Sequence, residues 1–391
     1  MSDFDFTGKF IKKSIIALSS LLLLVVVGLF LYANRCGLGL TYDSHIYLKI
    51  AEQIGSDGFF SADGLRIKPP IYPLAIHWVG EESLTVLNLA CLLVSTGVLF
   101  YLGLNLKSTS LKVLYFIFIA FVTPHYLTHA FAWTEPLFIT GLLLAFLFYY
   151  LHETRSTGWL LYISLFLFLL LPFVRFSGIL IVVPIFAFIF INAAKSVRNA
   201  IIAIGALGVV IIGFWVLKNA DGFLDRWNTL LMPFHSGSPD MYLHNLDAYL
   251  EGFSLFFLPL SIYKPLRMVL AALVLLVIIL QALQQLSKGN TNIWTVGILS
   301  TFNFYYVTLH PIFHVEYYTA ERYLTPLFGL LVFSGVMSLD NKWKSLNRSL
   351  QIVAVCLLFW LGAYNTVRTL KNVIFWHDTR CEIVDKKGGS N

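Results

Sequence analysis

The chain has 391 residues, of which 58% are hydrophobic and only 12% are charged, with a mean hydropathy of +0.77. A water-soluble globule does not have this composition, so the sequence predicts an integral membrane protein. The formal net charge of +6 does not indicate nucleic-acid binding, because the basic residues do not cluster with exposed aromatic side chains on a soluble face.

Eleven apolar runs follow one another along the chain, and each could cross about 30 Å of hydrocarbon as a helix. Lipid offers no partner for backbone amides, and the runs lack the strict alternation of barrel strands, so we expect helices. The predicted fold class is all-α, a polytopic bundle with spans at 14–33, 84–104, 113–131, 135–151, 159–173, 178–194, 199–217, 268–286, 293–309, 324–339 and 350–369.

The first run follows Lys12 and Lys13 without a small-residue cleavage pattern, so we expect it to be retained as a span. Basic residues gather in the loops on one side of the predicted bundle, which the positive-inside rule assigns to the cytoplasm. The N-terminus is then cytoplasmic and the C-terminus is outside. These basic residues are Lys9, Lys12, Lys13, Lys107, Lys112, Arg155, Lys195, Arg198, Lys288, Lys342, Lys344 and Arg348.

Two segments on the predicted outer side, 34–83 and 218–267, are too long to be simple connectors. In the first, isoleucine recurs every fourth position over residues 44–54. This spacing predicts an amphipathic helix that lies on the membrane and is begun by Asp43 or Ser44. The second segment is typical of two interfacial helices joined by a flexible loop.

The chain is expected to form one membrane domain over residues 1–372, followed by a short extracytoplasmic tail at 373–391. Its four cysteines show no Cys-x-x-Cys spacing, which argues against a zinc site or a redox pair. Cys36 and Cys381 both fall on the outer side, where the sequence allows a disulfide between them but does not fix it.

Several ionisable residues fall at the predicted outer ends of spans, where helix packing would gather them around one cavity. Taken singly, each also fits a plain structural role, since an acid can cap a helix and an arginine can pair with a neighbouring acid or reach lipid phosphates. Their convergence on one face favours a functional site. These residues are Asp43, Lys68, Glu135, Arg175 and Arg322.

The segments around these residues resemble the polytopic GT-C glycosyltransferases. The closest branch includes protein O-mannosyltransferases and the bacterial aminoarabinose transferases that modify lipid A. The resemblance extends over most of the chain, in the right order, through 41–47 (TYDSHIY), 68–73 (KPPIYP), 134–138 (TEPLF), 175–178 (RFSG) and 321–326 (ERYLTP). It implies a polyprenyl-phosphate-linked sugar as donor and catalysis outside the cytoplasm.

By position, the resemblance assigns Asp43 as the catalytic base and Glu135 as a second acidic residue of the catalytic site, which would orient the acceptor or share the role of Asp43. It assigns Lys68 to the donor phosphate, and Arg175 and Arg322 match its basic positions approximately. Further candidates for substrate positioning are His45, Tyr47, Tyr72, Glu321 and Tyr323.

Asp43 is followed by Ser44, where the protein mannosyltransferases carry two adjacent acids, so a lipid-linked or polysaccharide acceptor is favoured over a protein. Asp43 would remove the acceptor proton while the oxygen attacks the anomeric carbon opposite the phosphate, which inverts its configuration. Lys68 with an arginine would stabilise the charge that develops on the phosphate. The lack of an endoplasmic-reticulum retrieval signal favours a prokaryotic plasma membrane.

A bound metal is the less favoured alternative to a site without cofactors. His125 and His129 are one helical turn apart, and His310 and His314 repeat that spacing near Glu316. Such pairs can ligate a divalent metal, but histidines that simply pack beside interfacial aromatic residues are more common. We therefore expect no cofactor and no metal.

Two other function classes share the composition of this chain. A transporter or flippase of a lipid-linked or anionic substrate would also have many spans, but carriers tend to show internal repeats or charges near mid-bilayer. Here the charges lie at one face and no repeat is found, which favours an enzyme. A structural subunit of a membrane complex is the third class, and in it the loop charges would be replaceable.

Overall fold

The computed structural model describes residues 3–58, 68–192, 195–218, 239–289, 292–312 and 317–388. Within these ranges the chain forms helices and no strand, apart from one isolated bridge between Gly39 and Phe131. The predicted all-α fold class is therefore confirmed.

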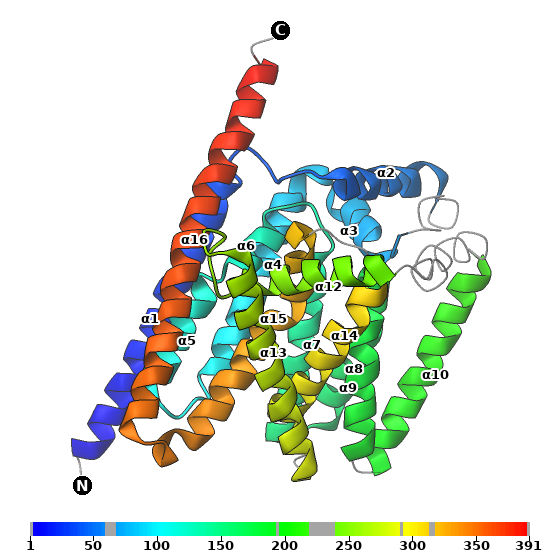
Figure 1. Ribbon diagram of the computed structural model, residues 1–391. Coiled ribbons are helices and arrows are strands. Elements are labelled where there is room, and N and C mark those ends of the chain that lie inside the picture. The colour runs from blue at the N-terminus through cyan, green and yellow to red at the C-terminus, as the bar shows by residue number, and fades with distance from the viewer. Residues whose placement is uncertain are drawn as a thin grey trace.

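The long helices form one bundle with roughly parallel axes, and α2 and α12 run across it (Figure 1). In chain order they are α1 (Asp3–Ala33), α2 (Tyr42–Asp57), α3 (Ile71–Val79), η2 (Glu81–Ser83), α4 (Leu84–Gly103), α5 (Thr109–Ala120), α6 (Thr123–His129), α7 (Glu135–Arg155), α8 (Gly158–Val174), η3 (Phe176–Gly178), α9 (Ile179–Asn192), α10 (Lys195–Lys218), α12 (Pro239–Ser254), α13 (Lys264–Ser287), η4 (Ile293–Gly297), α14 (Ile298–Ile312), α15 (Tyr317–Lys342), η5 (Trp343–Ser345) and α16 (Arg348–Gly388).

Seven described helical stretches are long and apolar enough to cross a membrane, so the chain is an integral membrane protein. Each of the eleven predicted apolar runs coincides with one or two helices. The seven stretches are Lys13–Ala33, Glu81–Gly103, Thr109–His129, Glu135–Arg155, Lys264–Ser287, Thr319–Ser345 and Arg348–Ile383, and shorter apolar helices occupy Gly158–Val174, Phe176–Asn192 and Val197–Ile211.

Helix α13 shows how a membrane-spanning helix divides its side chains between protein and lipid. Its exposed residues include Val269, Leu273, Val277 and Leu280, which recur at helical spacing on one face. The opposite face buries Ala271, Leu275, Ile278 and Ala282 against the bundle. A continuous apolar outer stripe is stable in hydrocarbon and would be unfavourable in water.

Helix α15 is central in the bundle. It packs against α4, α5, α6, α7, α12 and α14. In its most apolar stretch 67% of the residues are buried, compared with 28% for α13 and 11% for α16. Arg322 belongs to α15, so several neighbouring helices surround the helix that carries it.

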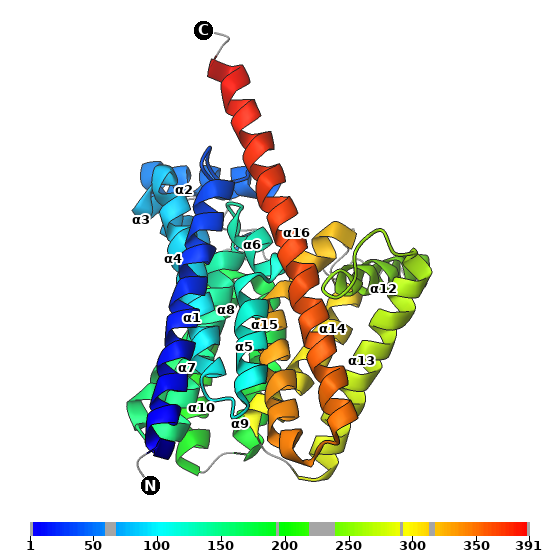
Figure 2. The same cartoon turned by 90° about the vertical axis from the view of Figure 1, so that its left-hand side faces the viewer.

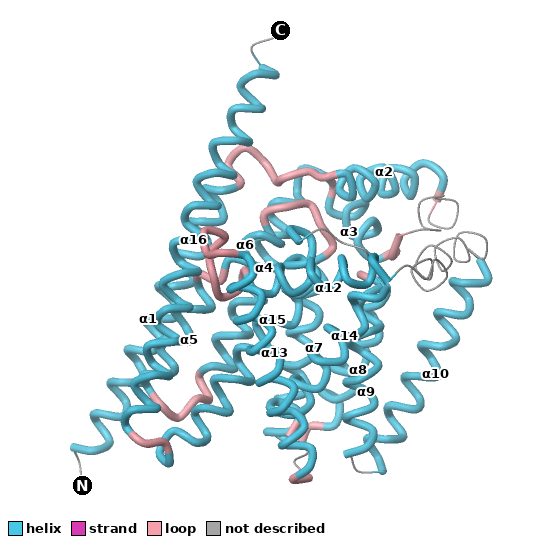
Figure 3. The backbone as a smooth tube through the Cα atoms, in the orientation of Figure 1, coloured by secondary structure: helices cyan, strands magenta, loops and turns pink. Residues whose placement is uncertain are grey.

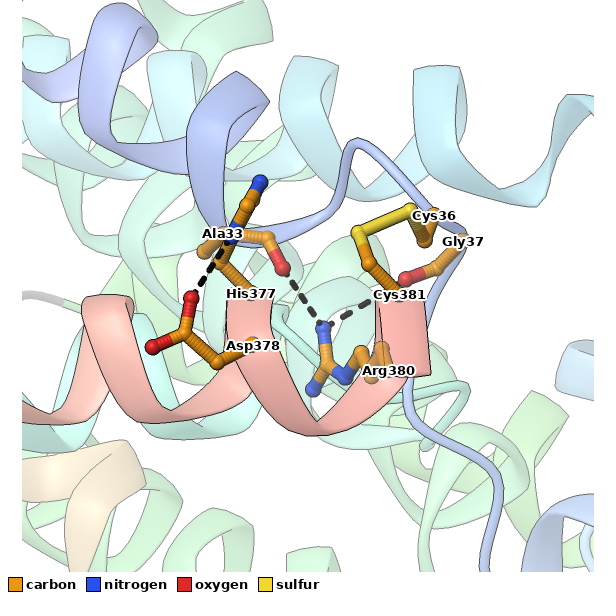
Figure 4. Close-up of a disulfide and its surroundings, with 7 residues drawn as sticks. All are labelled: Ala33, Cys36, Gly37, His377, Asp378, Arg380 and Cys381. Carbon is orange, nitrogen blue, oxygen red and sulfur yellow. Dashed lines mark hydrogen bonds and ion pairs between the residues drawn. A yellow bond between two sulfur atoms is a disulfide. The ribbon is translucent and has the colours of Figure 1, made fainter. Parts of the chain in front are cut away.

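Helices α1 and α16 lie on the same flank of the bundle and contact each other where they converge, toward the end from which the C-terminus projects (Figure 2). With 41 residues, α16 is about 60 Å long, well beyond the thickness of a hydrocarbon core. It continues unbroken past residue 372, where the sequence suggests a tail, and its C-terminal part projects from the bundle (Figure 1). A disulfide between Cys36 and Cys381 joins this part to the segment after α1 (Figure 4).

The connections between helices lie at the two ends of the bundle (Figure 3). Helices α2 and α3 lie at one end, which we call the α2 end, and the N-terminus lies at the other (Figure 1). The first residues of α7 and α15 and the last residues of α8 also reach the α2 end, which brings their charged side chains together.

Candidate functional site

Glu135 is the first residue of α7, where Pro136 fits because the first turn of a helix needs no backbone donor. Its side chain is 0% exposed. Oε1 contacts Arg175 Nη1 and Arg322 Nε, while Oε2 accepts from Arg322 Nη2 and from Thr134 Oγ1, each at 3.2 Å. One buried carboxylate therefore holds two guanidinium groups, which offsets the desolvation of all three charges.

Arg175 stands at the break between α8 and η3, with an extended backbone (φ −154°, ψ 128°). The chain turns tightly here, and only glycine fits at position 178, since a Cβ there would lie 2.9 Å from the carbonyl carbon of Leu171. Arg175 Nε donates to Ser177 Oγ at 3.0 Å, and the guanidinium lies 4.4 Å from the ring centroid of Tyr323. The cation is therefore fixed by a hydroxyl and a ring in addition to its carboxylate.

Arg322 connects three parts of the site from the central helix α15. Two of its nitrogens bind Glu135, and the third, Nη1, donates to Asp43 Oδ2 at 3.3 Å. Its guanidinium carbon lies 4.0 Å from the ring centroid of Trp133. A planar guanidinium can serve several acceptors at once in this way, which an ammonium group cannot do as rigidly.

Asp43 lies in the first turn of α2, and its Oδ1 accepts from Lys68 Nζ at 2.8 Å. Its side chain is 34% exposed. Burial raises the pKa of Asp43, but the hydrogen bond and charge of Lys68 and the charge of Arg322 outweigh burial, so the pKa lies below the ordinary value of 3.8. The carboxylate is therefore ionised at neutral pH.

A cavity of about 60 Å³ opens among these groups. Three cations and one carboxylate line it, while Glu135 lies behind the two arginines and does not reach it. The five charged side chains comprise three positive and two negative groups, a net charge of +1. The lining residues are Asp43, Tyr47, Lys68, Pro69, Thr134, Arg175, Phe176, Ser177, Arg322 and Tyr323.

The predicted positioning residues fall in different places. Tyr47 and Tyr323 line the cavity. Tyr72 is fully buried and packs edge-to-face on Tyr47, with ring centroids 5.2 Å apart. Burial, together with the charges of Asp43 and Glu135, raises the pKa of Tyr47, so its hydroxyl stays protonated. His45 is exposed and is not among the lining residues.

Glu321 is also outside the cavity, although it is adjacent to Arg322 in the sequence. Its carboxylate is buried and pairs with Arg368 of α16, with Oε2 and Nη2 2.6 Å apart. Arg368 also donates to the backbone oxygen of Leu255 at 2.8 Å. Arg368 therefore ties α16 to α15 and to the residue that follows α12.

The site also contains three residues that the sequence does not single out, namely Trp133, Thr134 and Ser177. Each is one or two positions from a predicted charged residue, and this proximity in sequence is the one feature that could have indicated them. Their roles depend on the tertiary contacts of the charged side chains, which single-sequence patterns do not encode.

The histidines do not assemble a metal site in the described part of the chain. His125 and His129 are buried on α6 with ring centroids 5.8 Å apart, and His129 Nδ1 hydrogen-bonds the backbone oxygen of His125 at 2.7 Å. The described residues contain no group of three or more His, Cys, Asp or Glu placed to hold a metal. The side chain of His310, and the whole of His314 and Glu316, lie outside the described residues.

Comparisons of the chain with protein-family models, with curated proteins and with solved structures give no match. The geometry of the cavity is therefore the basis for inferring a function. Guanidinium and ammonium groups around one space can bind a phosphate or another multivalent anion. The Asp43 carboxylate lines the same space.

Proposed function

We propose that the chain is an inverting GT-C type glycosyltransferase, which moves a sugar from a polyprenyl-phosphate donor to a hydroxyl of a lipid-linked or glycan acceptor. The observation that carries the proposal is the convergence of Asp43 with Lys68, Arg175 and Arg322 on one cavity of a helical membrane bundle. These are residues at which the sequence resembles the family, and they come from segments far apart in the chain.

The proposal includes a topology. All eleven apolar runs cross the membrane, the N-terminus is cytoplasmic, and the α2 end faces the outside of a prokaryotic plasma membrane. The basic loop residues at the opposite end of the bundle support this orientation. Nucleotide sugars do not cross a membrane unaided, so an outward-facing transferase needs a lipid-linked donor.

The reaction requires one proton transfer and one displacement. Asp43 accepts the proton of the acceptor hydroxyl, whose oxygen forms a bond to the anomeric carbon. The bond from that carbon to the phosphate oxygen breaks, and its electron pair stays on the phosphate. The leaving polyprenyl phosphate gains negative charge, so Lys68, Arg175 and Arg322 stabilise the transition state more than the bound donor.

The ion pairs of Asp43 fit an ordered reaction. A carboxylate held by Lys68 and Arg322 is a weak base because both cations stabilise its ionised form. A donor phosphate that binds the same two cations weakens their hold on Asp43. The base then becomes stronger only when the donor is in place.

Glu135 has a positioning role in this proposal in place of the second catalytic role that the family resemblance implies. Its carboxylate is fully buried and both oxygens are used by arginines or by Thr134. It therefore fixes two phosphate-binding groups at a short distance from each other. The clustering of charge at one end of the bundle also favours an enzyme over a carrier, whose binding groups lie near mid-bilayer.

The test is transfer by purified full-length protein with a panel of radiolabelled undecaprenyl-phosphate sugars and envelope lipids as acceptors. Asp43→Asn is expected to lower turnover by about 10²-fold or more, the usual contribution of a general base. Glu52→Gln is the matched control, because Glu52 is an exposed acid on the same helix. Normal turnover by folded Asp43→Asn would remove the proposed base.

A further inference from the structure

Trp133 contacts two parts of the site without lining the cavity. Its side chain is buried, at 8% exposure. The guanidinium of Arg322 lies 4.0 Å from its ring centroid, and the Phe131 ring stacks on it with centroids 4.5 Å apart and planes 13° apart. A guanidinium over an indole face is attracted by the ring electrons, most strongly where water is excluded.

The polar end of Trp133 reaches the start of α2. Its Nε1 donates to Thr41 Oγ1 at 2.9 Å, and the backbone N–H of Thr41 donates to Ser44 Oγ at 3.0 Å. Thr41 immediately precedes α2. The indole N–H therefore fixes the helix turn that carries Asp43.

The backbone beside Trp133 strengthens the same connection. Gly39 N donates to the carbonyl oxygen of Ala130 at 3.0 Å, and Ala132 N donates to the carbonyl oxygen of Gly39 at 3.0 Å. These two bonds form the bridge between the segment before α2 and the segment before α7. The segment that leads to Asp43 and the segment that leads to Glu135 are thus held in register with each other.

We infer that Trp133 is a positioning residue that sets the separation between Arg322 and Asp43, through its ring on one and through Thr41 on the other. The face that Arg322 occupies is not free to stack on a sugar, so its contribution is to the geometry of the charged groups. A residue that only filled space would affect the stability of the fold and not the placement of these two side chains. The expected effects on donor binding and on turnover, but not the positioning itself, rest on the proposed function.

The first experiment measures the position of Arg322 without a substrate. Phenylglyoxal modifies accessible guanidinium groups, and the rate at Arg322 can be followed by mass spectrometry of the full-length protein in detergent. Trp133→Leu removes the ring face, and we expect about tenfold faster modification, which lies between the values for an exposed and a fully desolvated cation–π contact. Trp133→Phe keeps a ring face and is expected to stay within about twofold of the parent.

Trp159→Leu is the matched control, because Trp159 is 60% exposed at the start of α8 and the substitution is the same. An unchanged modification rate at Arg322 in folded Trp133→Leu would overturn the inference.

If Trp133→Leu does not fold, the hydrogen bond from Trp133 Nε1 to Thr41 Oγ1 supplies a second test. Trp133→Phe removes its donor and Thr41→Val removes its acceptor. Because either change alone breaks the bond, the double variant should lose no more turnover than either single variant. Additive losses would overturn the inference.

Binding of undecaprenyl phosphate to the same proteins separates this inference from the proposed function. We expect Trp133→Leu to weaken binding about tenfold, and to have no further effect in an Arg322→Ala background. Equal weakening in both backgrounds would overturn the inference, since Trp133 would then not act through Arg322. Faster modification of Arg322 in Trp133→Leu, combined with no binding to the parent, would support the positioning role and remove the proposed donor.

Discussion

Asp43 and Glu135 are chemically similar, and their surroundings give them different capacities. Asp43 is 34% exposed and faces a cavity with Lys68 beside it, whereas Glu135 is fully enclosed behind two arginines. A proton acceptor must reach the hydroxyl that it deprotonates. Only Asp43 meets that condition, and Glu135 instead holds the cations in place.

The pH dependence of kcat/KM tests the interaction between Lys68 and Asp43, because kcat/KM reports the pKa values of the free protein. Lys68 lowers the pKa of Asp43, so kcat/KM falls with decreasing pH only below the ordinary range of a carboxylate. Lys68→Met removes this effect, and we expect the pKa of Asp43 to rise and the acid limb of kcat/KM to move to higher pH. Lys49→Met, at an exposed lysine of α2, should leave the limb in place. An unmoved limb in Lys68→Met would show that Lys68 does not act on the base.

Glu135→Gln tests the buried charge cluster through stability. The substitution leaves two guanidinium groups without their shared carboxylate, and we expect the free energy of unfolding to fall by about 3–5 kcal/mol. Unfolding in detergent measured by circular dichroism reports this loss. Glu82→Gln, at an exposed acid, should change stability by less than about 0.5 kcal/mol. Equal stability of the two variants would contradict the described ion pairs.

The lengths of the apolar runs and the residues that begin the helices can be read from the sequence. The run after Pro136 predicts α7, and the polar break around Arg175 predicts the end of α8. The bridge between Gly39 and Phe131 could not be predicted, because it joins two loops through backbone hydrogen bonds that leave no side-chain pattern. The pairing of Glu321 with Arg368 likewise depends on how α15 packs beside α16.

Gly39→Ala tests whether this bridge sets the site. A Cβ at Gly39 would overlap the Phe131 ring and lie 2.7 Å from Arg380 Nη2. We expect a loss of about 1–3 kcal/mol of stability and lower turnover, since the segment before Asp43 must move. Gly97→Ala is the matched control, because no atom lies within 4 Å of its added Cβ and alanine favours a helix. Full turnover in Gly39→Ala would show that the bridge does not position Asp43.

At the scale of the whole molecule, the disulfide joins parts of the chain that are 345 residues apart. The sequence places Cys36 and Cys381 on one side and allows the bond, and the structure shows it. Arg380, beside Cys381, donates to Asn34 Oδ1 at 2.6 Å and lies over the Phe131 ring at 5.0 Å. The bond therefore anchors α16 to the segment that leads from α1 to the site (Figure 4).

Removal of the disulfide is expected to destabilise the fold. Cys36→Ser with Cys381→Ser should lower the free energy of unfolding by about 2–5 kcal/mol, and a reducing agent should have the same effect on the parent. Cys356→Ser, at an exposed free cysteine, provides the control. An unfolding temperature that is insensitive to both the double substitution and the reductant would contradict this anchoring role.

The sequence alone predicts much of the membrane bundle because hydrocarbon imposes length and composition on every span. It also selects the five charged residues of the site, four of which line the cavity, since charge at the ends of apolar runs is unusual. It does not show that Glu135 and Asp43 have different roles, and it includes His45 and Glu321 among the positioning candidates although neither lines the cavity. The burial of a side chain and the identity of its ion-pair partner depend on how distant helices pack together, so a single sequence does not reveal them.

A structure of the full-length protein with bound undecaprenyl phosphate would test the proposed donor site directly. We predict that the phosphate lies within hydrogen-bond distance of Lys68 and of at least one of Arg175 and Arg322, in the cavity beside Asp43. A phosphate bound at the opposite end of the bundle, or anywhere away from these three cations, would contradict the proposed site.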